Sequence, residues 1–248
     1  LAVLTADHLI EPVDRFQQTL LSAVRAARET GALYTFGIRP TDPSPAFGYL
    51  EMGERSADDQ GIEHFHLASF REKPDVETAR RYLASGRHLW NSGMFVWTAA
   101  AVFEELQRHL PEHVEHLTRT VEAMDTGSWG EALRDGFSAL KRISIDFAVM
   151  EKARDVRCVC GPFSWRDVGG WLAVQDFLSC DDQGNRCRGF VRALDAGDNL
   201  VFCDQPGETL ALVGVRDLVV VRAGHRTLIA PKDRLEDVKR LVEALMAE

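Results

Sequence analysis

The feature that most constrains the fold is a short apolar segment, LYTFGI at residues 33–38, which comes directly after a segment with the pattern of an amphipathic helix. A strand with no polar alternation is expected to be covered on both faces. Before it, apolar residues recur at helical spacing, at Val13, Phe16, Leu20, Val24 and Ala27. Gly31 supplies the stop, and an apolar run at residues 1–4 comes before the helix. The order strand–helix–strand predicts a right-handed crossover, a parallel pair of strands and an α/β fold.

Capping residues delimit further helices. Asp75 is the predicted N-cap of one helix, which Gly86 ends. Thr98 is the predicted N-cap of the next, and Pro111 terminates it. A third helix is expected in the segment SIDFAVMEKA, with Ser144 as its cap. Strands are expected around residues 49–52 and 64–71.

After about Asp181 the pattern changes to short strands alternating with turns. The expected strands are Leu200–Phe202, Leu210–Val213, Leu218–Arg222 and Thr227–Ala230. Asp233 and Glu236 form a capping-box pattern for a final helix with an apolar stripe. We therefore expect two domains, a main domain over residues 1–181 and a β-rich C-terminal subdomain over residues 182–248 that is closed by one helix.

Charge and cysteine content narrow the class of protein. A formal net charge of −9 argues against partners such as nucleic acid or an anionic membrane, and no apolar run approaches the ~20 residues that a membrane span needs. Five cysteines at irregular spacing predict reduced, mostly buried thiols and a cytoplasmic protein. The spacing of Cys158, Cys160, Cys180 and Cys187 does not match the usual zinc-binding pairs.

Two aspartates stand where a strand ends. Asp7 follows the first apolar run in LTADHLI, and Asp167 precedes Gly169 and Gly170 in FSWRDVGGW. Ligands collect at the carboxyl ends of strands in open α/β sheets. The two carboxylates could hold one Mg²⁺, because this cation takes oxygen ligands and leaves room for substrate phosphates. The alternative is that each aspartate only makes turn hydrogen bonds.

Three further segments place polar groups beside apolar strands. In FREKPD, Lys73 can act as a point charge for a phosphate and Glu72 can accept hydrogen bonds from hydroxyls, although a surface ion pair is the alternative. In LWNSGMFVW, Asn91 either ties two backbones together or faces a polar ligand, because a buried amide is costly unless it is bonded. The residues next to it are Ser92 and Gly93, and FGYLE adds Gly48 and Tyr49 where the chain enters a strand.

Taken together, these segments resemble a known family. TADHLI, FGYLE, FREKP, WNSGMF, SIDFAVMEK and WRDVGGW occur in the order and approximate spacing of the sugar-nucleotide pyrophosphorylases, and more closely resemble the bacterial mannose-1-phosphate guanylyltransferases. The tail GVRDLVVV…APKDR resembles that family's short left-handed β-helix-like appendage. The resemblance implies an α/β fold, a Rossmann-like (glycosyltransferase A-like) mixed sheet flanked by helices, with a small left-handed β-helix-like subdomain and a terminal helix.

The resemblance also implies roles for the residues that match. Asp7 and Asp167 match the two metal-holding aspartates, and Lys73 matches the lysine that meets the sugar phosphate. The substrate-binding positions are Gly48, Tyr49, Glu72, Asn91, Ser92 and Gly93. Asp146 lies in a segment typical of the family, where charge complementarity at a helix N-terminus accounts for it. The implied reaction converts mannose 1-phosphate and GTP to GDP-mannose and pyrophosphate, with Mg²⁺ and without a covalent intermediate.

The sequence departs from the family at its start. The glycine-rich loop G-G-x-G-x-R-L-x-P-L and the base-reading segment would precede Leu1, so we expect a missing N-terminal part, an exposed sheet edge, weak stability and poor catalysis. A sister enzyme with another base or sugar, such as UTP with glucose 1-phosphate, and a non-catalytic binding or regulatory relative are the alternatives. No cupin-type isomerase domain follows, so no isomerase activity is expected. A homo-oligomer through the C-terminal subdomain is a further expectation.

Overall fold

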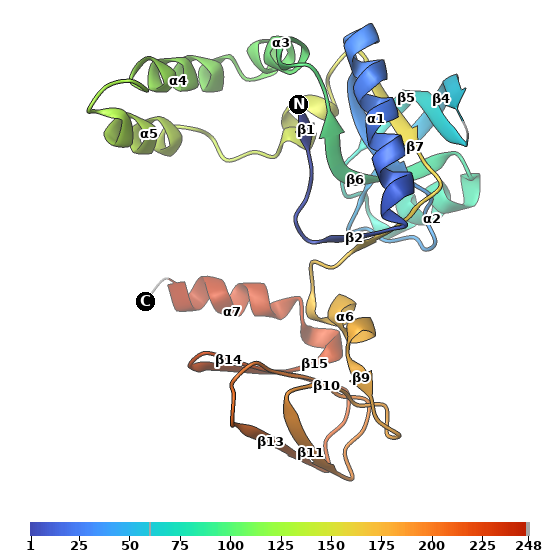
Figure 1. The fold of residues 1–248 in the computed structure, drawn as a ribbon, viewed down its shortest axis with the longest axis vertical. Coiled ribbons are helices and arrows are strands. Elements are labelled where there is room, and N and C mark those ends of the chain that lie inside the picture. The colour runs from blue at the N-terminus through green and yellow to red at the C-terminus, as the bar shows by residue number, and fades with distance from the viewer. Residues whose placement is uncertain (60, 247–248) are drawn as a thin grey trace. The chain divides into compact units, whose positions relative to one another are not determined.

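The computed structural model describes residues 1–59 and 61–246, and its contacts divide the chain into two compact units (Figure 1). The first unit contains residues 1–6 and 10–165, and the second contains residues 7–9 together with the chain from Arg166 onward. The domain boundary expected after residue 181 lies inside the second unit.

A six-stranded mixed sheet forms the centre of the first unit. Its strands, in spatial order, are β1 (Ala2–Val3), β6 (His88–Val96), β3 (Leu33–Ile38), β7 (Val156–Cys160), β5 (Ile62–Arg71) and β4 (Gly48–Asp59), and β4 also pairs with β6. β3 and β7 are parallel, whereas the other pairs are antiparallel. β1 and β3 run in the same direction, but the predicted direct pairing of these two strands is wrong, because β6 lies between them and bonds to both.

Helices cover both faces of this sheet, as the apolar strand LYTFGI predicted. α1 (Val13–Thr30) packs Ala23 and Ala27 against Tyr34 and Phe36 of β3. On the other face, Leu33 belongs to a separate cluster that includes residues of α3 (Ala99–His109) and of the π-helical turn η1 (Asp146–Met150). Alternate residues of one strand therefore contribute to two cores.

The predicted helix caps are confirmed. The backbone at Gly31 is left-handed (φ 72°) and ends α1. The Asp75 carboxylate accepts a hydrogen bond of 2.7 Å from the Thr78 N–H at the start of α2 (Val76–Ser85). The Thr98 hydroxyl accepts one of 3.1 Å from the Ala101 N–H. Each cap satisfies a backbone donor that the helix itself leaves unpaired.

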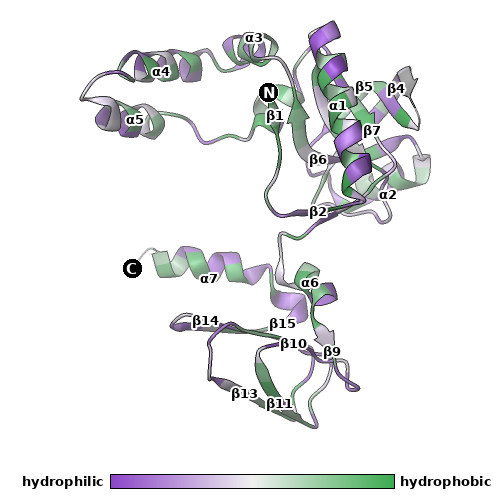
Figure 2. Cartoon of the chain, in the orientation of Figure 1, coloured by the Kyte–Doolittle hydropathy of each residue, from purple (hydrophilic) through white to green (hydrophobic). Residues whose placement is uncertain are grey.

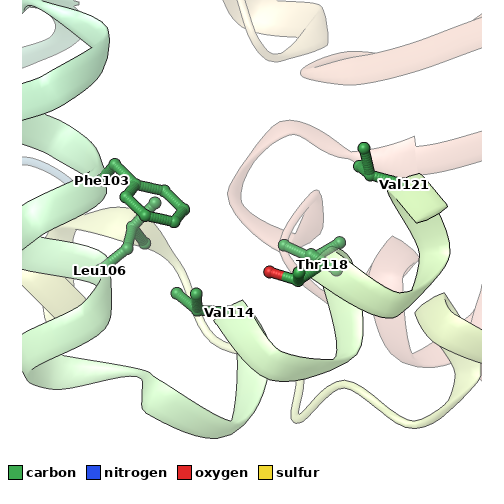
Figure 3. Close-up of a pocket in the computed structure, with 6 residues that line it drawn as sticks. Phe103, Leu106, Val114, Thr118 and Val121 are labelled. Carbon is green, nitrogen blue, oxygen red and sulfur yellow. The ribbon is translucent and has the colours of Figure 1, made fainter.

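Two helices extend from the end of α3. α4 (Pro111–Glu122) begins at the proline that ends the preceding helix, and α5 (Trp129–Ser138) follows after a turn. α3 and α4 enclose an apolar pocket of about 250 Å³ (Figure 3). Its lining residues are Phe103, Leu106, Val114, Leu117, Thr118 and Val121. The helix expected in SIDFAVMEKA is shorter than predicted, since only the single turn η1 forms there.

Short strands stacked in parallel build the second unit, in agreement with the expected β-helix-like subdomain. A five-stranded sheet has the order β15 (Arg226–Pro231), β14 (Leu218–Ala223), β12 (Leu200–Cys203), β10 (Arg186–Arg188) and β9 (Ser179–Cys180). A second sheet pairs β11 (Phe190–Leu194) with β13 (Thr209–Val213). The pairs β10–β12, β12–β14 and β11–β13 are all parallel, so successive turns of the chain stack on one another.

Two fully buried asparagines connect these turns. The Asn199 side-chain amide donates to Asn185 Oδ1 (2.9 Å) and to the Val215 carbonyl (3.0 Å). Its own Oδ1 accepts a hydrogen bond of 3.0 Å from the Leu218 N–H. Asparagine suits this position because it offers donors and an acceptor to backbone groups that water cannot reach.

The final helix, α7 (Asp237–Met246), begins later than the capping-box pattern predicts, after the 3₁₀ turn η3 (Lys232–Arg234). Leu235 packs against the β-sheet core, whereas Leu241 and Leu245 of the predicted stripe are exposed. Figure 2 shows the alternation of apolar and polar residues along this helix. Within the described part of the chain, no helix is long and apolar enough to cross a membrane.

Candidate active site

The first unit brings three of the predicted site residues together. The pairing of β4 with β6 places Gly48 opposite Asn91, and Glu72 follows directly after β5. A Cβ atom added at Gly48 would lie 2.4 Å from Glu72 Oε2 and 3.2 Å from Asn91 Cβ. Only glycine therefore leaves room for the Glu72 carboxyl group at this point, and the segments FGYLE, FREKP and WNSGMF meet here.

The Glu72 carboxyl group is held in an unusual environment. Its side chain is only 10% exposed, and Oε2 has no hydrogen-bond partner among the residues that the structure describes. Burial raises the pKa of Glu72, and the negative charge of Asp146 raises it further, while Lys73 opposes the shift. The Glu72 backbone N–H donates to Glu151 Oε1 at 2.8 Å.

Lys73 is the exposed cation beside this carboxyl group. Its Nζ lies 3.7 Å from Glu72 Oε1, and its side chain is 62% exposed. The backbone of Lys73 is left-handed, with φ at 43°, which is uncommon for a residue with a side chain. Such a conformation costs about 1–3 kcal/mol and often occurs where a side chain must be aimed at a ligand.

Asn91 is buried, and hydrogen bonds within the protein occupy most of the donor and acceptor positions of its side-chain amide. Its Oδ1 accepts from the Thr35 hydroxyl (2.8 Å) and from the Gly93 N–H (3.3 Å). Its Nδ2 donates to Asp146 Oδ1 at 2.9 Å. Asn91 therefore ties β3, β6 and η1 together, and only one N–H of the amide remains for a ligand.

The other predicted substrate-binding residues take part mainly in packing. Tyr49 is buried, and its hydroxyl donates to the Ser44 carbonyl at 2.9 Å. Ser92 is buried, and its Oγ accepts from the Met94 N–H at 3.3 Å. The backbone of Gly93 has a φ of 70°, which residues with a side chain rarely adopt. A role for these three residues in substrate binding stays a prediction.

A cavity of about 710 Å³ opens beside this cluster, within the usual range of about 300–1,000 Å³ for ligand pockets. Its polar lining combines three carboxyl groups with three cations, and the lining residues are Glu72, Lys73, Arg142, Ile143, Ser144, Asp146, Phe147, Glu151 and Lys152. Carboxylates accept hydrogen bonds from hydroxyls, and lysine and arginine bind phosphate. The lining therefore suits a ligand that carries both hydroxyl and phosphate groups.

The second unit brings Asp7 and Asp167 together. β2 (His8–Glu11) pairs with β8 (Ser164–Asp167), and the Val168 N–H donates to the Asp7 carbonyl at 3.0 Å. Burial lowers the pKa of His8, while the negative charges of Asp167 and Asp7 oppose this shift. The two aspartates are 160 positions apart in the sequence, yet Asp7 directly precedes β2 and Asp167 ends the strand paired with it.

The donor set of these aspartates fits a hard cation. The Gly169 N–H donates to Asp167 Oδ1 at 2.8 Å and orients this carboxylate, while both aspartates are exposed. Among the residues that the structure describes, no group of three or more histidine, cysteine or acidic residues could hold a metal ion. Two carboxylates are sufficient for Mg²⁺, which usually completes its shell with waters and substrate phosphates.

Sequence reasoning missed the contacts of Asp146, Glu151 and Thr35. Asp146 was explained by charge at a helix N-terminus, whereas in the structure its carboxylate holds the Asn91 amide. Glu151 binds the backbone of Glu72, and Thr35 binds Asn91. The available signal was that both acids belong to the segment SIDFAVMEK, which carried the resemblance.

Comparisons with known proteins identify families and relatives that this chain resembles. The model of the family described as nucleotidyl transferase matches residues 1–182, and that of the MannoseP isomerase/GMP-like beta-helix domain matches residues 190–245. The mannose-1-phosphate guanylyltransferase of Escherichia coli K12 is 36% identical over 99% of this chain and 51% of its own length. That of Salmonella montevideo is 38% identical over the whole chain and 52% of its own length.

A solved structure is also similar. The crystal structure of a protein described as a mannose-1-phosphate geranyltransferase from Thermus thermophilus has a TM-score of 0.78 and 34% identity, covering 99% of this chain and 69% of that one. The chain spans about half the length of the curated relatives it matches. The resemblance inferred from the sequence motifs is thus confirmed, and the chain belongs to the nucleotidyl transferase family.

Proposed function

We propose that the complete protein transfers a guanylyl group from GTP to mannose 1-phosphate and releases pyrophosphate. The observation that carries this proposal is the meeting of Gly48, Glu72 and Asn91 beside Lys73, at a cavity that combines hydroxyl acceptors with cations. The names of the similar proteins from E. coli and Salmonella favour this activity.

In the first unit, the chain's own residues would bind and orient the sugar phosphate. Lys73 supports the phosphate with its ammonium group, and the carboxyl groups of the cavity accept hydrogen bonds from sugar hydroxyls. A phosphate oxygen of the sugar then forms a bond to the α-phosphorus of GTP, while the bond from that phosphorus to pyrophosphate breaks on the opposite side. No proton has to be transferred, so positioning and charge neutralisation do most of the catalysis.

In the second unit, Asp7 and Asp167 would hold a Mg²⁺ ion. When bound, the ion would offset the negative charge of a phosphate group. The chain's contribution is to hold the two carboxylates in place, through the hydrogen bonds from Val168 to the Asp7 backbone and from Gly169 to the Asp167 side chain.

The experiment is a substrate panel. Pyrophosphate release by the complete protein is measured with GTP, ATP and UTP, each combined with mannose 1-phosphate and glucose 1-phosphate. The proposal expects GTP with mannose 1-phosphate to give the highest kcat/KM. A higher value for another pair would indicate a sister enzyme, and no turnover with any pair would indicate a binding or regulatory relative.

Copies of the protein would also contact one another through the second unit. The sheet of β11 and β13 exposes Phe190, Leu194 and Val213, and exposed apolar patches often mark interfaces. The oligomeric state of the complete protein, measured by light scattering, tests this expectation. A protein that stays monomeric at high concentration would contradict it.

A further inference from the structure

Asp146 is an acid of the cavity whose carboxylate is held by the amide of a buried asparagine. It is the first residue of η1 and half-buried, and its Oδ1 accepts the hydrogen bond from Asn91 Nδ2. This bond uses one of about four acceptor positions that a carboxylate offers. Burial raises the pKa of Asp146, and the hydrogen bond from Asn91 opposes that shift.

Asn91 cannot turn its amide over. A rotation would place Oδ1 against the Asp146 carboxylate and the NH₂ group against the Gly93 N–H. The amide is therefore locked with its N–H toward Asp146. The Asp146 carboxylate is thus held by the buried Asn91. Asp146 lines the cavity, so the remaining acceptor positions of its carboxylate can serve a ligand there.

The other two carboxyl groups of the cavity have different surroundings. Glu151 is engaged by the Glu72 N–H. Glu72 Oε2 is buried against Gly48, and Glu72 Oε1 faces Lys73. Asp146 and Glu72 line the same cavity, and the negative charge of Asp146 raises the pKa of Glu72.

We propose that Asp146 is a further sugar-binding residue, an inference that rests on the proposed function. Its carboxylate accepts a hydrogen bond from a ring hydroxyl of the hexose 1-phosphate, while Asn91 keeps it in position. A hydroxyl donor suits this wall of the cavity, because a phosphate would be repelled by Asp146 and Glu72, whereas the Lys73 ammonium attracts it. Asp146 would thus contribute to the selection of the sugar and would not affect the binding of the nucleotide.

The experiment compares Asp146→Asn and Asp146→Ala with the parent in the complete protein. The substrates are mannose 1-phosphate and its analogues in which one ring hydroxyl is replaced by hydrogen. In the parent, one analogue should lose about 10- to 100-fold in kcat/KM, the usual effect of a hydrogen bond to a charged group. In both variants the intact sugar should lose a similar factor, and the discrimination against that analogue should fall to about threefold or less. The KM for GTP should not change.

Asp146→Asn retains an acceptor for the Asn91 amide and so keeps the contact that holds η1, which makes it the variant expected to fold normally; its melting temperature checks this. Asp135→Asn, at an exposed position of α5, is the matched control and should behave like the parent. If Asp146→Asn folds and still discriminates against every analogue as the parent does, Asp146 does not touch the sugar, although the proposed function stands. If the parent itself uses no hexose 1-phosphate, both proposals are wrong.

Discussion

Replacing Gly48 by alanine tests how the site is built. The new methyl group would lie 2.4 Å from Glu72 Oε2, where real Cβ contacts are essentially never found. The backbone of Gly48 is fixed by its pairing with β6. The carboxyl end of Glu72 is the more mobile partner, so the Glu72 side chain is expected to give way.

The magnitude follows from the displacement. The carboxyl group must move by about 1 Å to reach an ordinary contact distance, and a misplacement of this size can cost roughly 10²-fold in rate. Stability should fall by no more than about 1–3 kcal/mol, the usual cost of an overpacked site. The expected phenotype is therefore a folded protein with a much lower kcat/KM for mannose 1-phosphate.

The assay is steady-state pyrophosphate release by the complete protein, together with urea unfolding. Gly130→Ala is the matched control, because a Cβ at Gly130 meets nothing within 4 Å, and it should leave kcat/KM unchanged. A folded Gly48→Ala variant whose kcat/KM for mannose 1-phosphate stays within about twofold of the parent would refute this explanation.

Three more predictions concern separate parts of the chain. Asp167→Ala should lower pyrophosphate release by about 10²-fold or more without changing the melting temperature, because the side chain is exposed; near-normal turnover would show that the metal assignment is wrong. Burial and the charge of Asp146 raise the pKa of Glu72 above its ordinary value of 4.5. Between pH 4.5 and the pKa of the folded state, the folded protein therefore holds a proton that the unfolded chain has released, and the free energy of unfolding falls as the pH rises through this window. Urea unfolding should therefore show that the stability of Glu72→Gln relative to the parent increases as the pH rises through this window. A stability difference between the two proteins that does not change with pH would contradict the raised pKa of Glu72. Asn199→Ala should cost about 2–4 kcal/mol in unfolding free energy, because Asn199 is fully buried and bonds to Asn185, Val215 and Leu218. Thr227→Ala, at an exposed position, should cost little, and equal losses in the two variants would show that the hydrogen bonds of Asn199 are not the cause.

Several features of this protein can be predicted from the sequence because they depend on neighbours a few residues away. The caps at Asp75 and Thr98 and the left-handed stop at Gly31 each require only one suitable residue beside a helical pattern. The continuous apolar strand at residues 33–38 predicted that both faces of the strand are covered, and the short strands of the tail were predicted from alternating turns. The motifs likewise predicted the family.

The tertiary structure decided which of these segments meet and how their polar groups are used. The insertion of β6 between β1 and β3 follows from hydrogen bonds across more than fifty positions, which no local pattern encodes. Tyr49 fits the predicted motif, yet its side chain packs in the core, because successive side chains of a strand point to opposite faces. The sequence left two roles open for Asn91, a tie between two backbones or a contact to a ligand, whereas the structure shows that Asn91 joins two side chains, those of Thr35 and Asp146. Local periodicity and capping thus determine the elements of this chain, whereas strand register and the pairing of buried polar groups determine its site, since both depend on contacts that exist only once the chain has folded.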